Sequence, residues 1–382
     1  MVTDRVKGLK YAIRDVVLPA KKLEAQGHKI IKLNIGDPNH YDFDTPEHIR
    51  KAACDAINNG KNGYCDSHGN AAVLESLRAW DKRVNGTEAD SYLLTQGASE
   101  GVHFSFTCLV PPGGEALVPG PNYPQYMSRA NLCGGNPVEY ACVEEEGWQP
   151  DVDDVRKKIT GKTSVLAVIN PNNPTGAVYS KKTLQAIIDL AGEHSLPIIS
   201  DEIYDLLAFE ESVSLSSLVK DTPVITLNGI SKNYLAPGWR VGSMAFRNCP
   251  DIYESCATLA RNRLCVNTPC AWGYKAALDG PQGHIAETKK RLVERRDFVL
   301  KRFSEMGLEC TEPKGAFYAF PKIDTPDDKK WVLDLLHQEH VLVVHGSGFG
   351  EYGKGHFRMV VLAPVETLSI ALDRIEHFVT NK

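Results

Sequence analysis

Short apolar runs alternate with amphipathic stretches between about residue 90 and residue 250. The runs are rich in β-branched residues and are bounded by glycine, proline or asparagine, as is typical of buried strands. They predict strands at 92–95, 115–118, 165–169, 196–200, 224–227 and 241–246. Amphipathic stretches between some of these runs predict helices, at 98–109 and 181–194. This alternation predicts a mostly parallel sheet with helices on both faces.

The two ends of the chain follow other patterns. Before the alternating region, the sequence predicts helices at 18–25, 46–58 and 71–84 and a short strand at 30–35. After about residue 270, it predicts helices at 285–306 and 329–340, strands at 315–321, 341–344 and 356–361, and a final helix. We therefore expect a large domain at 36–270 and a smaller C-terminal α/β domain at 271–382. The N-terminal segment 1–35 is expected to pack with the small domain and the active site.

The composition is that of an ordinary globular protein, with 382 residues of which 42% are hydrophobic and 24% charged. A net charge of −5 gives no electrostatic reason to expect nucleic acid or a membrane surface as a partner. No stretch approaches the roughly 20 apolar residues that span a bilayer, and the charged first residues lack the apolar core of a signal peptide. The ten cysteines show no metal-ligand spacing and indicate reduced thiols. We expect a cytoplasmic protein without a metal site.

A lysine and an arginine follow one of the predicted strands. Lys232 comes after the strand at 224–227, and Arg240 stands eight residues further on. Ligands of open α/β sheets lie beyond the carboxyl ends of the strands. A desolvated lysine amine there can lose its proton and condense with an aldehyde, and Arg240 would hold an anion beside that aldehyde. Taken alone, a lysine after a strand is more often simply solvated.

Two loops have features that suit a phosphate and an aromatic ring. The small residues Ala98 and Ser99 open a predicted helix, whose first amides and dipole can bind a phosphate. The proline-rich loop 119–124 is stiff and projects Tyr123, which suits stacking on an aromatic ligand. Tyr64 lies on a polar loop before the helix at 71–84, and its sequence context favours packing over a role in a site.

Polar residues near other strands add to the same picture. Asn173 lies in a rigid turn with two prolines and three asparagines, which gives its side-chain amide a fixed direction. Asp201 ends a buried strand, where an acid is costly unless it is paired. Arg358 stands inside an apolar strand and suits either a ligand carboxylate or a structural ion pair. Gly36 lets backbone amides approach a ligand or simply closes a turn.

These motifs stand in the order and spacing found in the class I aminotransferases, fold-type I enzymes that use pyridoxal 5′-phosphate (PLP). The chain resembles that family over essentially its whole length. The motifs that carry the resemblance are Asn173-Pro174-Thr175-Gly176, Asp201-Glu202-Ile203-Tyr204, Ser231-Lys232 with Arg240, and Arg358. Three stretches are similar more narrowly to prokaryotic alanine aminotransferases: 33–38, 120–124 and 227–232. The resemblance implies a mostly parallel, seven-stranded-type sheet between helices in the large domain.

The resemblance also implies a role for each candidate residue. Lys232 would hold PLP covalently and then move a proton between the substrate Cα and the cofactor. Asp201 would pair with the pyridinium nitrogen and keep it protonated. The remaining cofactor contacts would be a stacked ring from Tyr123, hydrogen bonds to the phenolic oxygen from Asn173 and Tyr204, and phosphate contacts from Ala98, Ser99, Ser231 and Arg240. The substrate α-carboxylate would be bound by Arg358, Asn173 and the Gly36 amide.

Tyr64 matches the tyrosine that members of the family extend across a dimer interface, so the resemblance implies a homodimer with shared active sites. Members of the family often stack a tryptophan on the cofactor ring, whereas the alanine-type branch usually has a tyrosine, as here at Tyr123. The favoured activity is therefore transamination between L-alanine and 2-oxoglutarate. For the distal carboxylate of 2-oxoglutarate we favour Arg14 over Arg263, and Tyr11 with Tyr123 would enclose a small side chain.

Three other interpretations stay open. An aspartate or broad-specificity aminotransferase would use the same cofactor site with a dedicated cation for the distal carboxylate. A PLP-dependent C–S lyase would share the scaffold and Lys232. A regulator that only senses ligands would normally carry a DNA-binding domain, for which we expect no room outside the aminotransferase-like region.

Overall fold

The computed structural model describes residues 6, 9 and 16–381. Its largest element is an eight-stranded sheet with the order β2-β9-β8-β7-β6-β3-β4-β5. These strands are β2 (Ser91–Thr95), β3 (Glu115–Gly120), β4 (Asn136–Val143), β5 (Gln149–Pro150), β6 (Thr163–Ile169), β7 (Ile198–Asp201), β8 (Val224–Gly229) and β9 (Gly242–Arg247). β9 is antiparallel to both of its neighbours and β5 to β4, while the other pairs are parallel. The predicted mostly parallel α/β sheet is confirmed.

The sheet contains two strands that the apolar pattern did not predict. β4 is only partly buried and carries Pro137 and Glu139, so it lacks the apolar run that marks a buried strand. β5 has two residues, too few to give a pattern, and adds an edge strand to the seven-stranded type.

Helices cover both faces of this sheet. Side chains alternate along β6: Val165 and Ala167 face α6 (Ala98–Leu109), α7 (Gln125–Leu132) and α10 (Pro250–Arg263). Leu166 and Val168 face α8 (Val152–Lys158) and α9 (Lys181–Glu193). At the β2 end of the sheet, further apolar side chains join α4 (Glu47–Asn58), α5 (Ala71–Val84) and α11 (Thr268–Asp279). Strands buried on both faces explain the continuous apolar runs in the sequence.

Polar side chains cap the start of several helices. The side chain of Asn70 accepts a hydrogen bond from the amide of Ala72 at the start of α5. Ser180 accepts one from Thr183 at the start of α9. Such caps satisfy amides that have no partner within the helix. The bounds of α5 agree with the predicted helix at 71–84.

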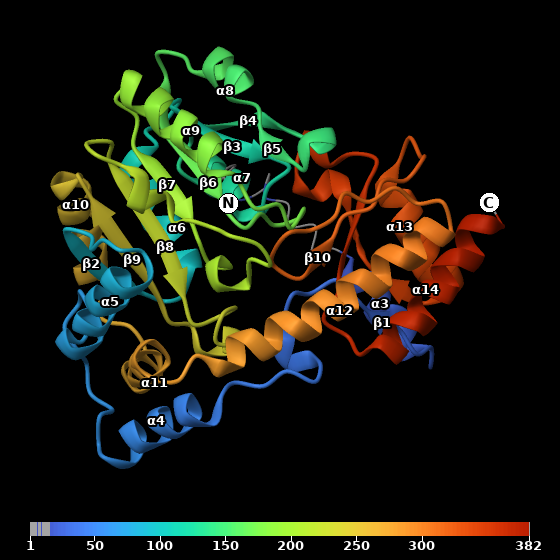
Figure 1. The fold of residues 1–382 in the computed structure, drawn as a ribbon, viewed down its shortest axis with the longest axis horizontal. Helices are drawn as coiled ribbons and strands as arrows, with labels where there is room; N and C mark the ends of the chain where they lie inside the picture. The colour runs from blue at the N-terminus through green and yellow to red at the C-terminus, as the bar shows by residue number, and fades with distance from the viewer. Residues whose placement is uncertain (1–5, 7–8, 10–15, 382) are drawn as a thin grey trace.

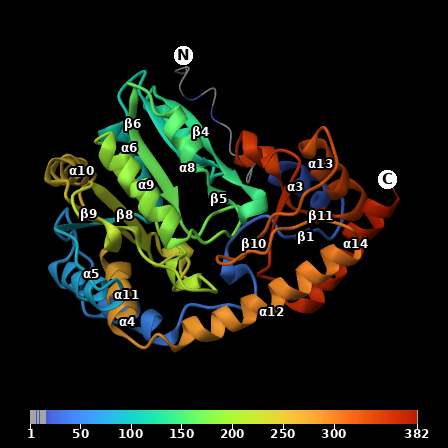
Figure 2. The same cartoon turned by 45° about the horizontal axis from the view of Figure 1, so that its top comes forward.

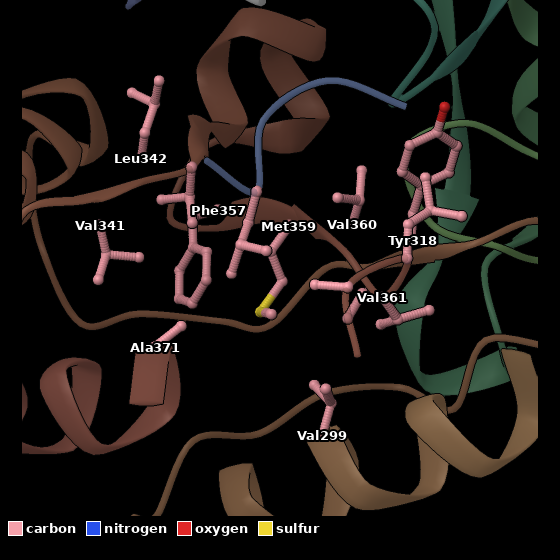
Figure 3. Packing of buried hydrophobic residues seen from close by; sticks show 14 of the residues in the cluster. Val299, Tyr318, Val341, Leu342, Phe357, Met359, Val360, Val361 and Ala371 are labelled. Carbon is pink, nitrogen blue, oxygen red and sulfur yellow. The ribbon is translucent and has the colours of Figure 1, made fainter. Parts of the chain in front are cut away.

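The C-terminal part is a smaller α/β unit beside the large sheet (Figure 1). Its antiparallel sheet has the order β10 (Tyr318–Ala319), β13 (Phe357–Val360), β12 (Val344–His345). The helices α12 (Gly283–Glu305), α13 (Asp328–Glu339) and α14 (Val365–Thr380) complete it. Figure 3 shows Phe357 and Met359 of β13 pointing toward Val299 of α12 and Ala371 of α14, which belong to the same buried cluster.

The N-terminal segment joins this smaller part. β1 (Ile31–Lys32) pairs in parallel with β11 (Val341–Leu342), and α3 (Val17–Ala25) contacts α13. α12 runs along the molecule from the region of α4 and α11 to α14 (Figure 2). Residue 270 lies inside α11, which packs on α4 and α5 of the large part. We therefore propose that the large domain ends with α11, at Asp279, rather than at residue 270.

None of the helices in the part of the chain that the structure describes has both the length and the apolar character that crossing a bilayer requires.

Candidate active site

A cavity of about 440 Å³ lies at the carboxyl ends of the parallel strands, where the large and small parts meet. The predicted site residues that line it are Gly36, Ala98, Ser99, Tyr123, Asn173, Asp201, Tyr204, Ser231, Lys232, Arg240 and Arg358. They come from strands, helix starts and loops that are far apart in the sequence. The fold therefore brings most of the predicted site into one place.

Four of the candidate residues lie elsewhere. Tyr11 and Arg14 fall outside the described residues. Tyr64 is 85% exposed and does not line the cavity of its own chain. Arg263 is also absent from the lining, and its Nη1 lies 3.2 Å from Oε2 of Glu100. Its guanidinium also donates to the carbonyls of Ser67 and Leu94 and lies 6.0 Å from the centroid of the Phe104 ring, all outside the cavity.

Lys232 stands in the loop that follows β8. Its Nζ donates a hydrogen bond to the carbonyl of Gly36 at 2.5 Å, which joins the loop to the segment after β1. Burial lowers the pKa of Lys232 to about 8; Asp37 opposes this shift, and the charges of Arg358 and Arg240 add to it. A lysine with a lowered pKa offers an unprotonated amine near neutral pH, as condensation with an aldehyde requires.

Asp201 ends β7 and is only 6% exposed. Its Oδ2 accepts a hydrogen bond from the hydroxyl of Tyr126 at 2.8 Å, and its Oδ1 accepts one from the amide of Ile203 at 3.2 Å. Burial raises the pKa of Asp201 to about 6, while these two hydrogen bonds lower it. The carboxyl group is therefore mostly ionised at neutral pH. A buried anion of this kind suits a cationic partner such as a protonated ring nitrogen.

Aromatic side chains from both parts form the walls of the cavity. The hydroxyls of Tyr204, after β7, and Tyr318, on β10, lie 2.7 Å apart. Tyr123 lines the cavity just before α7, and the amide of its neighbour Asn122 donates to the carbonyl of Phe349 at 2.9 Å. At Gly36, an added Cβ would lie 2.5 Å from the Tyr318 hydroxyl, so a glycine is needed for this close approach.

One end of the cavity is built for an anion. Ala98 and Ser99 begin α6, whose N-terminus carries partial positive charge. The Arg240 guanidinium donates to the carbonyls of Pro237 at 3.0 Å and Gln96 at 3.2 Å. Gly97 has a φ of 74°, and an added Cβ would lie 2.6 Å from Arg240 Nη2. A helix N-terminus, an arginine and the hydroxyls of Ser99 and Ser231 fit a phosphate group.

The other end holds a buried arginine. Arg358 is 1% exposed; its Nη1 donates to Oδ1 of Asn173 at 2.8 Å and its Nη2 to the carbonyl of Asn34 at 2.6 Å. Its Nε has no hydrogen-bond partner among the described residues. The Tyr318 ring lies beneath it, with its centroid 4.5 Å from the guanidinium carbon. Arg358 forms no ion pair within the described residues, and its unpartnered Nε–H suits a ligand carboxylate.

Sequence reasoning missed three residues at this site. Asp37 and Tyr318 line the cavity, and Tyr126 hydrogen-bonds to Asp201 from outside it. Tyr318 lies in the predicted strand at 315–321, whose residues are all buried, so nothing in the pattern set it apart. Tyr126 lies on α7, three residues after Tyr123. The sequence did not predict this helix, so no pattern marked Tyr126 as a candidate.

Comparisons with known proteins identify similar chains. A family model described as aminotransferase class I and II matches residues 28–375. The alanine aminotransferase of Mycobacterium tuberculosis is 37% identical, over 99% of this chain and 92% of its own length. The glutamate-pyruvate aminotransferase AlaA of Escherichia coli is 38% identical, over 99% of this chain and 98% of its own. The solved structure of an alanine aminotransferase from Pyrococcus furiosus matches with a TM-score of 0.97 and 50% identity, and the match covers 100% of this chain and 100% of that chain.

The surroundings of Lys232 predict how its reactivity depends on pH. The rate at which the amine condenses with PLP should rise with pH and level off above about 8, because the amine is unprotonated above its pKa. Asp37→Asn should move the midpoint to lower pH, because Asp37 raises the pKa of Lys232. Stopped-flow absorbance measurements at a series of pH values test both points. A midpoint near the ordinary lysine value, or one unmoved by Asp37→Asn, would contradict this account.

Proposed function

Because this chain belongs to the class I and II aminotransferases, we propose that it transfers the amino group of L-alanine to 2-oxoglutarate, giving pyruvate and L-glutamate. Enzymes of this family depend on PLP and act on amino acids and 2-oxoacids. The observation that carries the proposal is the cavity itself. It holds a lysine of lowered pKa together with Arg240 and Arg358, two arginines that each suit an anion.

The residues at the Arg240 end fit the cofactor. Arg240, Ser99, Ser231 and the first amides of α6 would hold its phosphate, and Tyr123 would stack on its ring. Asp201 would hold the proton on the ring nitrogen, while Asn173 and Tyr204 would hydrogen-bond to the phenolic oxygen. When bound, PLP supplies an electron sink for the electron pair released at the substrate Cα.

The residues at the other end would bind and orient the substrate. Arg358 is held by Asn173 and by the carbonyl of Asn34, which fixes the plane of its guanidinium before a carboxylate binds. A pre-oriented arginine loses little freedom on binding a carboxylate. Lys232 Nζ would then take the proton from the substrate Cα and return it to the adjacent cofactor carbon. The lowered pKa of Lys232 suits this alternation between the neutral and the charged amine.

The preference for alanine is supported by the names of similar proteins and by the charges in the cavity. Lys232, Arg240 and Arg358 are the cationic residues that line it among the described part of the chain, and each has a proposed role. An enzyme dedicated to dicarboxylates needs a further cation for the distal carboxylate. We propose that Arg14 provides it when 2-oxoglutarate or L-glutamate binds, and that Tyr11 and Tyr123 enclose the smaller substrate.

Half-reactions test this specificity. L-Alanine should convert the PLP form to the pyridoxamine form faster than L-aspartate does in stopped-flow spectra. Arg14→Ala should slow the reaction with L-glutamate more than the reaction with L-alanine. Faster reaction with L-aspartate would make the chain an aspartate aminotransferase. Sulfide release from L-cysteine without ketoacid exchange would indicate a C–S lyase, and salt-dependent DNA binding without turnover would indicate a regulator.

We further propose a homodimer in which Tyr64 reaches the cofactor of the neighbouring subunit. Exposed apolar side chains support this: Ile57 is 52%, Tyr64 85% and Leu264 55% exposed. The segments that carry Tyr64 and Leu264 are joined, because Thr268 Oγ1 donates to the carbonyl of Gly63 at 2.9 Å. With all ten cysteines free, the chain also suits the reducing cytoplasm that we propose for it.

If the active sites are shared in a homodimer, activity should depend on the association of two subunits. Sedimentation at assay concentrations should show a dimer, because Tyr64 has no role in the cavity of its own chain. Tyr64→Phe should weaken PLP binding by about tenfold, since one hydrogen bond to a charged phosphate is lost. A fully active monomer would contradict the proposal.

A further inference from the structure

Tyr126 is a fully buried residue in the first turn of α7. Its ring meets that of Phe106 on α6 edge-on, with centroids 5.8 Å apart and an interplanar angle of 72°. This packing sets the direction of the hydroxyl, which donates to Oδ2 of Asp201 at 2.8 Å. Tyr126 therefore contacts the carboxylate from the helix side and does not itself line the cavity.

The pKa of Asp201 is set mainly by its immediate surroundings. Burial raises it, and the hydrogen bonds from Tyr126 and from the amide of Ile203 lower it. The Tyr126 bond is the shorter of the two, at 2.8 Å against 3.2 Å. Within the described residues, the other titratable groups that line the cavity or stand next to Asp201 in the chain are Asp37, Tyr123, Glu202, Tyr204, Lys232, Arg240, Tyr318 and Arg358. Removal of the phenol would take away the main donor that stabilises the ionised carboxylate.

We propose that Tyr126 is a positioning residue that orients the Asp201 carboxylate and keeps it ionised for the ring nitrogen of PLP. This inference rests on the proposed role of Asp201. A neutral Asp201 would not hold a proton on that nitrogen by charge attraction. The Tyr126 hydroxyl would therefore set how far the pH can fall before the protein loses affinity for its cofactor.

The sign of the effect follows from the ionisation of Asp201. Its carboxyl group is charged above a pKa of about 6 and neutral below it. PLP affinity should therefore fall as the pH falls through that value. Without the Tyr126 hydroxyl the pKa of Asp201 is higher, so the decline should begin nearer neutrality, by about one pH unit for the loss of one hydrogen bond to a charged group.

The chain offers a matched control for this experiment. Tyr140 is also fully buried, and its hydroxyl donates to the carbonyl of Ala167 at 2.9 Å rather than to Asp201. Tyr126→Phe and Tyr140→Phe each remove one hydroxyl and one hydrogen bond from a buried tyrosine. The measurement is the dissociation constant of PLP for the apo chain at a series of pH values, expressed as the ratio of each variant to the parent. Because PLP and Lys232 titrate in the same way in the parent and in both variants, their effect on the dissociation constant cancels in this ratio.

For Tyr126→Phe, the ratio should rise by several-fold between slightly alkaline and slightly acidic pH, while for Tyr140→Phe it should stay level. A level ratio for Tyr126→Phe would overturn the inference. If Tyr126→Phe does not fold, 3-fluorotyrosine at position 126 keeps the ring and the hydroxyl. Its more acidic phenol is a stronger donor, so the decline should shift to lower pH, and an unmoved decline would overturn the inference equally.

Asp201→Asn separates this inference from the role of Asp201 itself. The asparagine variant should bind PLP weakly and lack the decline near pH 6, and adding Tyr126→Phe to it should change the pH profile no further. A parental pH profile in Asp201→Asn would refute the proposed role of Asp201. If Asp201→Asn loses the decline but Tyr126→Phe leaves it in place, only the inference about Tyr126 fails.

Discussion

The cost of burying charge at the carboxyl ends of the strands governs this structure. Asp201 and Arg358 are buried and Lys232 is partly buried at one cavity, and an unpaired buried charge costs several kcal/mol. The protein meets part of this cost itself, because burial lowers the pKa of Lys232 to about 8 and raises that of Asp201 to about 6. Arg358 keeps an N–H without a partner among the described residues. In the function that we propose, a phosphorylated cationic ring and a carboxylate substrate would complete these groups.

Lys232 and Arg358 also join the two parts of the fold. Lys232 donates to Gly36, and Arg358 donates to Asn173, across the boundary between the large sheet and the smaller unit. The hydroxyls of Tyr204 and Tyr318 meet across it as well. We propose that the large part holds most of the residues for the cofactor, and that Arg358 of the small part and Gly36 bind the substrate carboxylate together with Asn173 of the large part. Small displacements between the parts would change the distance between these two sets.

The sequence predicted the elements whose signal is local. Apolar runs marked the buried strands, and the amphipathic pattern after a polar loop marked α5. The roles proposed for the cavity residues came from the family resemblance, which rests on the order and spacing of the motifs. The contact between Tyr126 and Asp201 joins residues 75 positions apart, so it depends on how α7 packs on the sheet. Likewise, the sequence alone could not decide whether Arg358 forms a structural ion pair or binds a ligand carboxylate, because only the folded chain shows which carboxylates lie near it.

We propose that Lys232 is the residue that condenses with PLP, in a cavity that also holds Arg240 and Arg358. Reduction of the PLP-loaded protein with borohydride fixes the cofactor to whichever lysine carries it, and peptide mapping by mass spectrometry then locates the label. This account predicts the label on Lys232 and its absence after prior conversion to the pyridoxamine form with L-alanine, which releases the lysine. A label on any other lysine, or on none in a yellow and active protein, would contradict it.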